Sequence, residues 1–293
     1  MGGNKNEKDI VSHPCGDDGR VIGGLRFFRR RKLQPAGAPA SSAAGSTAAN
    51  SEAASAPAEG AITSAADLAG KKIGVQAGTT GEVYVQENVA DAELGSYKSG
   101  MDAALDLKNG KIDAVVLDEL PAKSIVAQND DLMILDADLA TEEYAIAVKK
   151  GNTELLEAIN ATIARMQEDG TYESLVNAFM PAGGDSEIKI PDAVGTEGDK
   201  TIKMGTNAAF KPFEYVEGTE VVGFDISMAQ QIAQDMGAKL QVEDMAFDSL
   251  ISALDAGAID FVAAGMTATE ERRQSVDFSD PYYSSKQVII LKK

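Results

Sequence analysis

The sequence predicts an α/β protein of two similarly built lobes with a ligand cleft between them. From residue 61 onwards, apolar strand-like runs alternate with amphipathic helical stretches, which is typical of parallel sheets covered by helices. The alternation stops in a polar stretch at 182–199 and then starts again. Residues 107–115 and 254–262 both consist of a helix end, a glycine and an Ile-Asp-apolar strand. Two such lobes leave a cleft at their strand ends, where ligands of open sheets bind.

Residues 1–60 have a different composition from the rest of the chain. The first 35 residues hold eight Lys or Arg against four Asp or Glu, and residues 36–60 are a low-complexity Ala/Ser/Pro/Gly tract. We therefore expect a disordered basic head followed by a flexible linker. The head lacks the apolar core of a signal peptide, and no lipobox is visible in it.

Composition excludes several classes of function. The net charge of −19 argues against a nucleic-acid partner. His13 and Cys15 are the only histidine and cysteine, and both lie in the basic head. The body of the chain therefore cannot hold a Cys/His metal site, a thiol nucleophile or a Ser-His-Asp triad. Neither a metal nor a cofactor is expected, and no apolar run is long enough to span a membrane.

The elements follow in chain order. Residues 61–143 are expected to form one lobe, with strands at 72–75, 94–97, 112–117 and 132–135 and helices at 81–88, at 101–109 and from 119 onwards. An extended segment at 143–148 precedes a long amphipathic helix that Asn152 caps and Gly170 ends, and then a short helix at 172–179. After the linker at 182–199, strands are predicted at 201–206, 240–242, 259–264 and 285–293, and a hairpin is predicted at 214–224. Helices are predicted at 225–236 and 247–254, and Asp225 is expected to cap the first of them.

The stretch from Gly265 to Arg273 is the best candidate for an anion site. The buried strand before it ends at Gly265, and Thr267 or Thr269 can cap the helix that follows, with Glu270 in capping-box spacing from Thr267. A helix N-terminus attracts anions, and Arg272 could fork onto a carboxylate. A surface helix with solvated charges is the competing interpretation.

Several motifs resemble a known family, the polar amino-acid-binding proteins of bacterial ABC importers (extracellular solute-binding protein family 3). The segments at 205–215, 222–225, 265–272 and 276–283 resemble the family's first lobe, and those at 71–81 and 113–118 resemble its second lobe. The resemblance covers about 61–181 and 200–293. It implies a two-lobed, type II periplasmic-binding-protein-like fold that binds its ligand without chemical change.

The order of the segments departs from the family. There, the segment that resembles 200–293 comes first, the one that resembles 61–143 follows, and 144–181 returns to the first lobe through a hinge strand. We therefore expect a circular permutation cut at a hinge crossover between Lys293 and Ala61, with 182–199 joining the family's usual termini and one hinge strand left near Tyr144. A tandem pair that lost opposite halves is the alternative.

The resemblance also implies how the two poles of a ligand are held. Arg272 would clamp the ligand α-carboxylate, helped by Thr267 and the backbone at Gly265. Asp118 would accept the α-ammonium group, supported by Gly265 and by the loop that carries Thr79 and Thr80.

The remaining residues that the resemblance implies would hold the ligand side chain. Phe210 and Phe247 would lie on either side of it, while Asn207 and Gln76 would contact its polar end. Because Asn207 and Gln76 are neutral, the preferred ligand is an uncharged polar L-amino acid such as glutamine. A basic amino acid, attracted by the acidic body, is the runner-up.

Two other classes of function stay open at this point. One is a dehydratase of the same fold, with Glu119 or Glu270 as general acid. The other is a sensor module or a rearranged product without function. The expected partners are a free amino acid and, if the chain is exported, the membrane subunits of an ABC importer. The resemblance implies an extracytoplasmic location, in the periplasm or on a lipid anchor. We expect a monomer, with a lobe-swapped dimer as the alternative.

Overall fold

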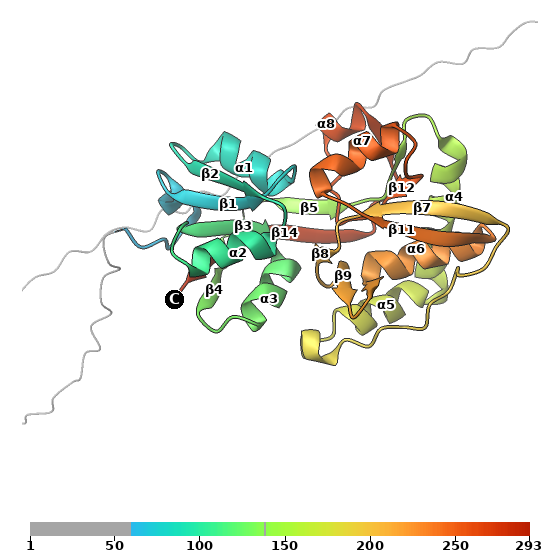
Figure 1. Cartoon of the computed structure of the whole chain (residues 1–293), viewed down its shortest axis with the longest axis horizontal. Coiled ribbons are helices and arrows are strands. Elements are labelled where there is room, and N and C mark those ends of the chain that lie inside the picture. Colours follow the sequence, from blue (N-terminus) through green and yellow to red (C-terminus); the bar gives the residue numbers. More distant parts are fainter. Residues whose placement is uncertain (1–59, 138) are drawn as a thin grey trace, which may run out of the picture. The chain divides into compact units, whose positions relative to one another are not determined.

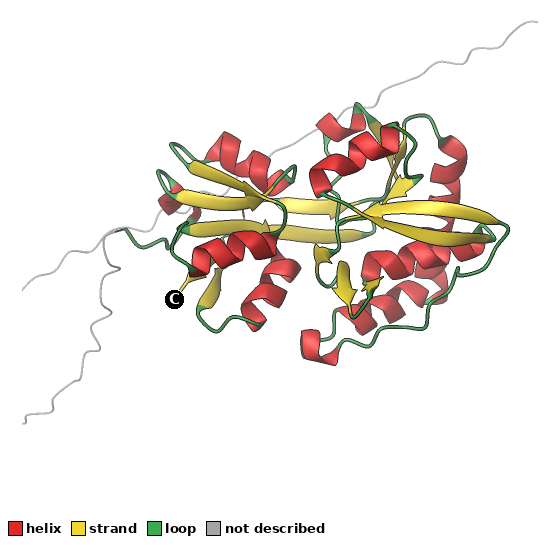
Figure 2. Ribbon diagram, in the orientation of Figure 1, coloured by secondary structure: helices red, strands yellow, loops and turns green. Residues whose placement is uncertain are grey.

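The computed structural model describes residues 60–137 and 139–293. The basic head and most of the Ala/Ser-rich linker lie outside the described residues. The architecture is mixed α/β, as predicted, with two main sheets that belong to the two lobes (Figures 1 and 2).

The second lobe is built on a six-stranded sheet. Its strand order is β2-β1-β3-β14-β4, and β5 pairs with β14. The strands are β1 (Lys72–Gln76), β2 (Glu93–Tyr97), β3 (Ala114–Asp118), β4 (Leu132–Leu135), β5 (Thr141–Tyr144) and β14 (Tyr283–Lys292). The helices of this lobe are η1 (Ala65–Leu68), α1 (Thr80–Asn88), α2 (Gly100–Lys108) and α3 (Glu119–Ala127). Strand β3 is buried along its whole length, as its unbroken apolar run predicts for a central strand.

The first lobe is built on a five-stranded sheet of order β11-β7-β12-β6-β13. These strands are β6 (Ala147–Lys149), β7 (Lys200–Thr206), β11 (Ala238–Asp244), β12 (Phe261–Val262) and β13 (Val276–Phe278). A small sheet holds β8 (Ala209–Phe210), β9 (Glu214–Glu217) and β10 (Glu220–Val222). The helices are α4 (Thr153–Asp169), α5 (Thr171–Phe179), α6 (Phe224–Asp235), η3 (Phe247–Ser249), α7 (Leu250–Asp255) and α8 (Glu270–Arg273).

Helix α4 shows how local signals set the bounds of an element. The Asn152 side chain accepts a hydrogen bond from the Leu155 N–H, and Gly170 ends the helix in the left-handed conformation at φ 81°. Both ends were predicted from these residues. Helix α6 differs from its prediction, because Gly223 rather than Asp225 occupies the N-cap position and the Asp225 side chain is buried.

Strand β14 corrects the predicted lobe boundary. Residues Tyr283–Lys286 pair with β5, whereas Gln287–Lys292 pair with β3 and β4 inside the second lobe. The assignment of all of 200–293 to the first lobe is therefore wrong for its last residues. The prediction of one remaining hinge strand is also wrong, because β14 and the chain from β5 to β6 both cross between the lobes (Figure 1). Four consecutive apolar residues, 288–291, are buried in β14, which favours a central position in a sheet over a free end.

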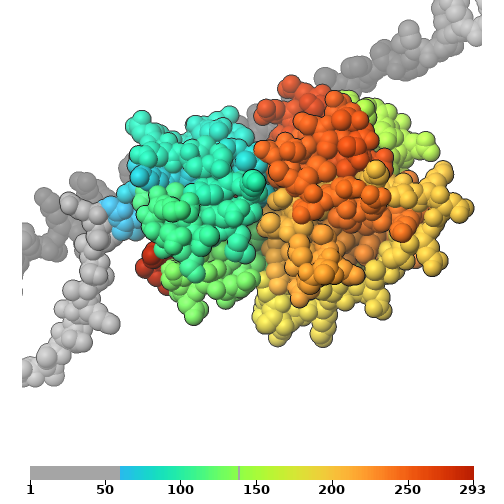
Figure 3. Space-filling view, in the orientation of Figure 1, coloured from blue at the N-terminus to red at the C-terminus, as the bar shows by residue number. Residues whose placement is uncertain are grey.

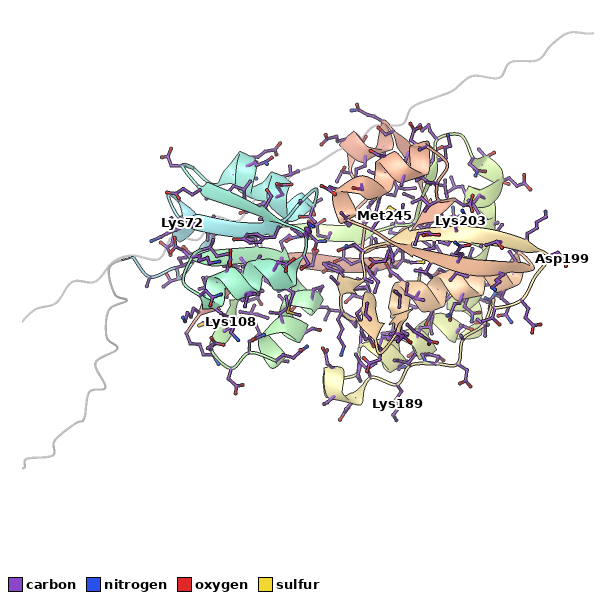
Figure 4. All side chains as sticks on the ribbon, viewed as in Figure 1. Lys72, Lys108, Lys189, Asp199, Lys203 and Met245 are labelled. Carbon is purple, nitrogen blue, oxygen red and sulfur yellow. The ribbon has the colours of Figure 1, made fainter. Side chains whose placement is uncertain are left out.

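The segment 182–199 lies against the first lobe instead of looping freely. It contains the short helix η2 (Asp185–Glu187), and the Gly195 carbonyl accepts a hydrogen bond from the Leu240 N–H. Figure 4 labels Lys189, which lies within this segment, and Asp199 at its C-terminal end. The linker predicted at 182–199 is thus held by main-chain hydrogen bonds to the first lobe.

Candidate functional site

A small cavity lies where residues of both lobes meet. Its volume is about 10 Å³, and its lining consists of Gln76, Thr79, Thr80, Asp118, Phe210, Glu214, Phe247, Ala264, Gly265, Thr267 and Arg272. Nine of the ten residues expected to bind ligand are therefore brought together around one space. Asn207 is not part of the lining.

Arg272 lies on α8 and contacts both lobes. Its Nη1 donates to the Thr267 carbonyl at 2.7 Å and its Nη2 donates to the Gly78 carbonyl of the second lobe at 2.8 Å. The guanidinium also lies over the Phe247 ring, 5.4 Å from its centroid. Among the described residues no carboxylate lies within ion-pair distance of Arg272, so the guanidinium retains the means to fork onto a ligand carboxylate.

The turn before α8 matches one of the two predicted capping arrangements. Thr269 caps the helix, with its Oγ1 accepting from the Arg272 N–H, while the Thr267 hydroxyl donates to Glu142. The capping box between Thr267 and Glu270 is therefore not formed. Because α8 has only four residues, its dipole is small, and the guanidinium is the main attraction for an anion.

Gly265 contributes through its missing side chain and its carbonyl. Its φ is 54°, and a Cβ there would lie 2.7 Å from the Phe210 ring, so only glycine fits. Its N–H donates to Asp225 Oδ2 at 2.9 Å. The backbone N–H that was expected to assist a ligand carboxylate is therefore already used, and the Gly265 carbonyl is the group left to accept from an ammonium.

Asp118 ends β3 and is 6% exposed. It occupies the N-cap position of α3, yet its side chain makes no capping bond and instead accepts from Gln287 Nε2 at 2.6 Å. Burial and then the nearby Glu142 carboxylate raise the pKa of Asp118 well above its usual range, while Tyr144 and Arg272 act in the opposite direction. An ammonium group bound next to Asp118 would stabilise the ionised carboxylate and lower its pKa again.

The two threonines and the two phenylalanines have distinct settings. The Thr79 hydroxyl donates to the Gln76 carbonyl and accepts from the Glu82 N–H, which caps α1, and Thr80 begins that helix. Phe210 and Phe247 are 6% and 8% exposed and come from two separate elements of the first lobe, β8 and η3. Both rings reach the cavity, where they can contact the apolar part of a ligand side chain.

Gln76 and Asn207 bond to each other across the two lobes. Gln76 Nε2 donates to Asn207 Oδ1 at 2.9 Å, and Asn207 Nδ2 donates to the Met245 carbonyl at 2.8 Å. Within the part of the chain that the structure describes, Gln76 Oε1 has no hydrogen-bond partner. Both ends of the Asn207 amide are therefore engaged, and Asn207 links the two lobes instead of lining the cavity.

Four buried polar residues of the site were missed by sequence reasoning. Glu214 lines the cavity, Asp225 holds Gly265 and the Tyr282 hydroxyl, and Glu142 and Gln287 lie behind Thr267 and Asp118. Burial and the neighbouring Asp225 raise the pKa of Glu214 well above its usual range, and burial raises the pKa of Asp225 to about 6. The only available signal was an acidic residue within an otherwise apolar run, as at Phe213–Glu214–Tyr215.

The lobes are in contact around the cavity. Besides the bonds of Arg272 and Gln76, the Ser124 hydroxyl donates to the Lys211 carbonyl at 3.3 Å. In Figure 3 the second-lobe surface, coloured cyan to green, meets the orange surface of the first lobe along a seam. A cavity of about 10 Å³ holds roughly one water molecule, so an amino acid can enter only if the lobes separate or their side chains shift.

Two α/β lobes joined by crossing strands, with a cationic and an acidic pole facing one cavity, define a solute-binding class of protein. The chain belongs to the bacterial extracellular solute-binding proteins, family 3, whose sequence model matches residues 88–182 and 202–293, more than half of the chain.

The relatives of the chain are named as amino-acid-binding proteins. The arginine-binding extracellular protein ArtP of Bacillus subtilis is 49% identical over 96 residues, 33% of this chain and 38% of ArtP. The L-cystine-binding protein TcyJ of Escherichia coli K12 is 40% identical over 125 residues, 42% of this chain and 47% of TcyJ. A probable histidine-binding protein of Campylobacter jejuni is 43% identical over 90 residues, 31% of this chain and 35% of that protein. The chain thus spans between a third and a half of the length of these relatives.

Two features are absent from the described part of the chain. No group of three or more His, Cys, Asp or Glu within 60–137 and 139–293 is arranged to hold a metal ion. Over the same residues, none of the helices has the length and apolar character needed to cross a bilayer.

Proposed function

We propose that this protein binds a cationic L-amino acid between its lobes, without chemical change, for delivery to the membrane subunits of an ABC importer from an extracytoplasmic location. The charge balance of the cleft carries the proposal. Four buried carboxyl groups, those of Asp118, Glu142, Glu214 and Asp225, face or support a cavity that contains one guanidinium. A net positive ligand offsets this excess of acid, whereas a neutral zwitterion leaves it unbalanced.

The two poles of the site match the common part of every amino acid. Arg272 on the first lobe is the group for the α-carboxylate, and Asp118 on the second lobe is the group for the α-ammonium. A ligand that bridges them stabilises the closed arrangement by its differential affinity for it. Glu214, which lines the same cavity and is 1% exposed, then remains as the acceptor for a cationic side chain.

The comparison between ligand classes favours the basic runner-up over glutamine. The preference for glutamine rested on Asn207 and Gln76 as groups that face the ligand. Asn207 does not line the cavity and accepts from Gln76 Nε2, so Gln76 Oε1, a hydrogen-bond acceptor, is the amide group left for a ligand side chain. Among the relatives reported above, one is named for arginine and one for histidine, which supports a cationic ligand.

A dehydratase activity finds no support in the positions of the two candidate acids. Glu119 forms an ion pair at 2.7 Å with Lys123, one turn further along α3, and Glu270 is exposed on α8. Neither residue lines the cavity. The family and the names of the relatives agree with binding without catalysis.

Calorimetry of the purified chain against the twenty common L-amino acids and L-cystine tests the proposal. L-Arginine is expected to bind with the lowest Kd, followed by other cationic amino acids, with L-glutamine weaker. Tighter binding of L-glutamine or L-cystine would assign the cleft to that ligand class. Silence for the whole panel, together with no ligand-induced rise of the melting temperature, would favour the sensor or rearranged-product interpretation.

We also propose that the family's segments occur here in permuted order, with the cut at the far end of the second lobe. The resemblance supplies the order, and the position of the two chain segments supports it. Gly60–Ile62 and Leu291–Lys293 line one cavity of about 400 Å³, and the Lys293 N–H donates to the Asp131 carbonyl beside it. The expected cut at a hinge crossover is thereby moved to the end of the sheet, beyond both crossing strands.

Relinking the chain tests the permutation. In the variant, Lys293 is joined to Ala61 through a short Gly/Ser linker, residues 1–60 are removed, and new ends are opened within 183–198. We expect its Kd for L-arginine to stay within about threefold of the parent, because nearby ends tolerate this change. The same variant with Arg272→Ala is the control for binding at the cleft. A relinked chain that unfolds or loses binding would contradict the permutation.

A further inference from the structure

Gln287 is a buried polar residue in the strand that crosses between the lobes. It is 1% exposed and lies directly opposite Asp118 in the antiparallel pairing of β14 with β3. The residues that follow it, Val288 to Leu291, are apolar and buried. A glutamine in such a run is uncommon unless its amide has specific partners.

The amide of Gln287 contacts three parts of the site. Its Nε2 donates to Asp118 Oδ1 at 2.6 Å and lies 3.5 Å from Glu142 Oε1. Its Oε1 lies 3.0 Å from the position that a Cβ on Gly81 would take, so the amide packs against the first turn of α1, next to Thr79 and Thr80. One neutral group with two N–H donors thus separates two carboxyl groups that would otherwise repel each other.

The contacts continue into the first lobe through Glu142. This residue is 2% exposed on β5, and its Oε2 accepts from the Thr267 hydroxyl. The Thr267 carbonyl in turn accepts from Arg272 at 2.7 Å. The path from Asp118 through Gln287, Glu142 and Thr267 to Arg272 therefore runs along both strands that join the lobes.

We propose that Gln287 is a positioning residue of the ligand site: its side-chain amide orients the Asp118 carboxylate toward the ammonium of the ligand and links it through Glu142 to the pole that holds the carboxylate. This inference rests on the proposed function. Glu142, Glu214, Tyr144 and Arg272 are the titratable or charged groups that face Asp118 or act on it. The Gln287 amide and the Tyr144 hydroxyl are both neutral groups that favour the charged form of Asp118, and the Gln287 amide is the one of the two that also contacts Glu142 through a hydrogen-bonding nitrogen.

A structural role alone predicts a different outcome from a positioning role. If Gln287 only fills space in β14, replacing it changes stability and leaves the Asp118 charge as it was. If it positions Asp118, loss of the two N–H donors raises the pKa of Asp118 and weakens the capture of an ammonium group. The pKa of this one carboxyl group, measured in the ligand-free protein, separates the two roles.

The experiment uses the full chain and three variants. Gln287→Met keeps a similar volume and removes the donors, and Gln287→Glu keeps the shape and replaces the donors with a third carboxyl group. Gln241→Met is the matched control, because Gln241 is an exposed glutamine that also donates to a carboxylate, Glu243, at 2.6 Å. The Asp118 carboxyl carbon is followed by NMR over a pH titration without ligand, and the Kd for L-arginine is measured by calorimetry.

Gln287→Met is expected to raise the pKa of Asp118 and to weaken L-arginine binding about ten- to hundredfold. Gln287→Glu is expected to act in the same direction, and Gln241→Met is expected to change neither quantity. An unchanged pKa of Asp118 in folded Gln287→Met or Gln287→Glu overturns the inference. If the parent chain binds no amino acid while the pKa still rises, the proposed function fails and the role of Gln287 in setting the Asp118 charge stands.

Discussion

Arg272→Ala is expected to weaken the binding of L-arginine by about 2–5 kcal/mol, which corresponds to at least about thirtyfold in Kd. The guanidinium faces the cavity with two N–H groups bonded to main-chain carbonyls, and its charge is the one cation among the lining residues. Without it, the ligand carboxylate would enter a cavity surrounded by buried acids. Calorimetry on the variant measures the loss, and the melting temperature without ligand shows whether the fold is retained.

Arg273→Ala is the matched control for this prediction. Arg273 lies on the same short helix and its guanidinium also lies 5.4 Å from an aromatic ring centroid, that of Phe278, but it is exposed and does not line the cavity. Its removal should leave Kd within about twofold. Arg272→Lys keeps the charge and loses the planar fork, so we expect an intermediate loss. Equal affinities for Arg272→Ala and the parent would contradict the clamp.

Local signals in the sequence were sufficient for much of the fold. Asn152 and Gly170 fixed both ends of α4, because a side-chain cap and a left-handed glycine act within a few residues of each other. Gly265 and Arg272 were found for the same reason: a strand end, a turn and a helix start follow one another directly along the chain. The alternation of strands and helices likewise gave two α/β lobes.

Contacts between residues far apart in the chain could not be predicted from the sequence. An apolar run such as 288–291 indicates a buried strand, but its composition is the same whether it ends one lobe or enters the sheet of the other. Gln287 and Glu142 gain their role from partners far away in the chain, Asp118 and Thr267. Asp225 resembled a helix cap from its sequence position, and only the fold shows that it reaches Gly265 and Tyr282 instead.

Acidification from about pH 7 to about pH 5 is expected to weaken L-arginine binding and, at the same time, to stabilise the ligand-free protein. The pKa values of Asp118 and Glu214 are raised by burial and by their acidic neighbours, and burial raises that of Asp225 to about 6. A cationic ligand binds the ionised carboxyl groups, so binding releases protons and the affinity falls as these groups become protonated. Calorimetry in two buffers of different ionisation enthalpy counts the protons released.

The stability of the ligand-free protein changes with pH in the opposite direction to its affinity for the ligand. A carboxyl group whose pKa is higher in the folded than in the unfolded state holds its proton longer when folded, so its contribution is complete at low pH and is lost as pH rises through the folded pKa. For Asp225 this window runs from its ordinary 3.8 to about 6. Carboxyl groups with lowered pKa values, such as Asp106 and Asp277, lose their stabilising contribution only below that window.

The two opposite trends distinguish a carboxyl-lined cation site from general acid sensitivity. Asp118→Asn should flatten the pH dependence of the remaining affinity, because one of the titrating groups is gone, while Asp106→Asn, at a surface ion pair with Lys111, should leave the profile of the parent. A neutral ligand held through Arg272 alone would show little pH dependence over this range. An affinity for L-arginine that stays constant from pH 7 to pH 5 would therefore argue against the buried carboxyl groups as partners of the ligand, even if Arg272 proves essential.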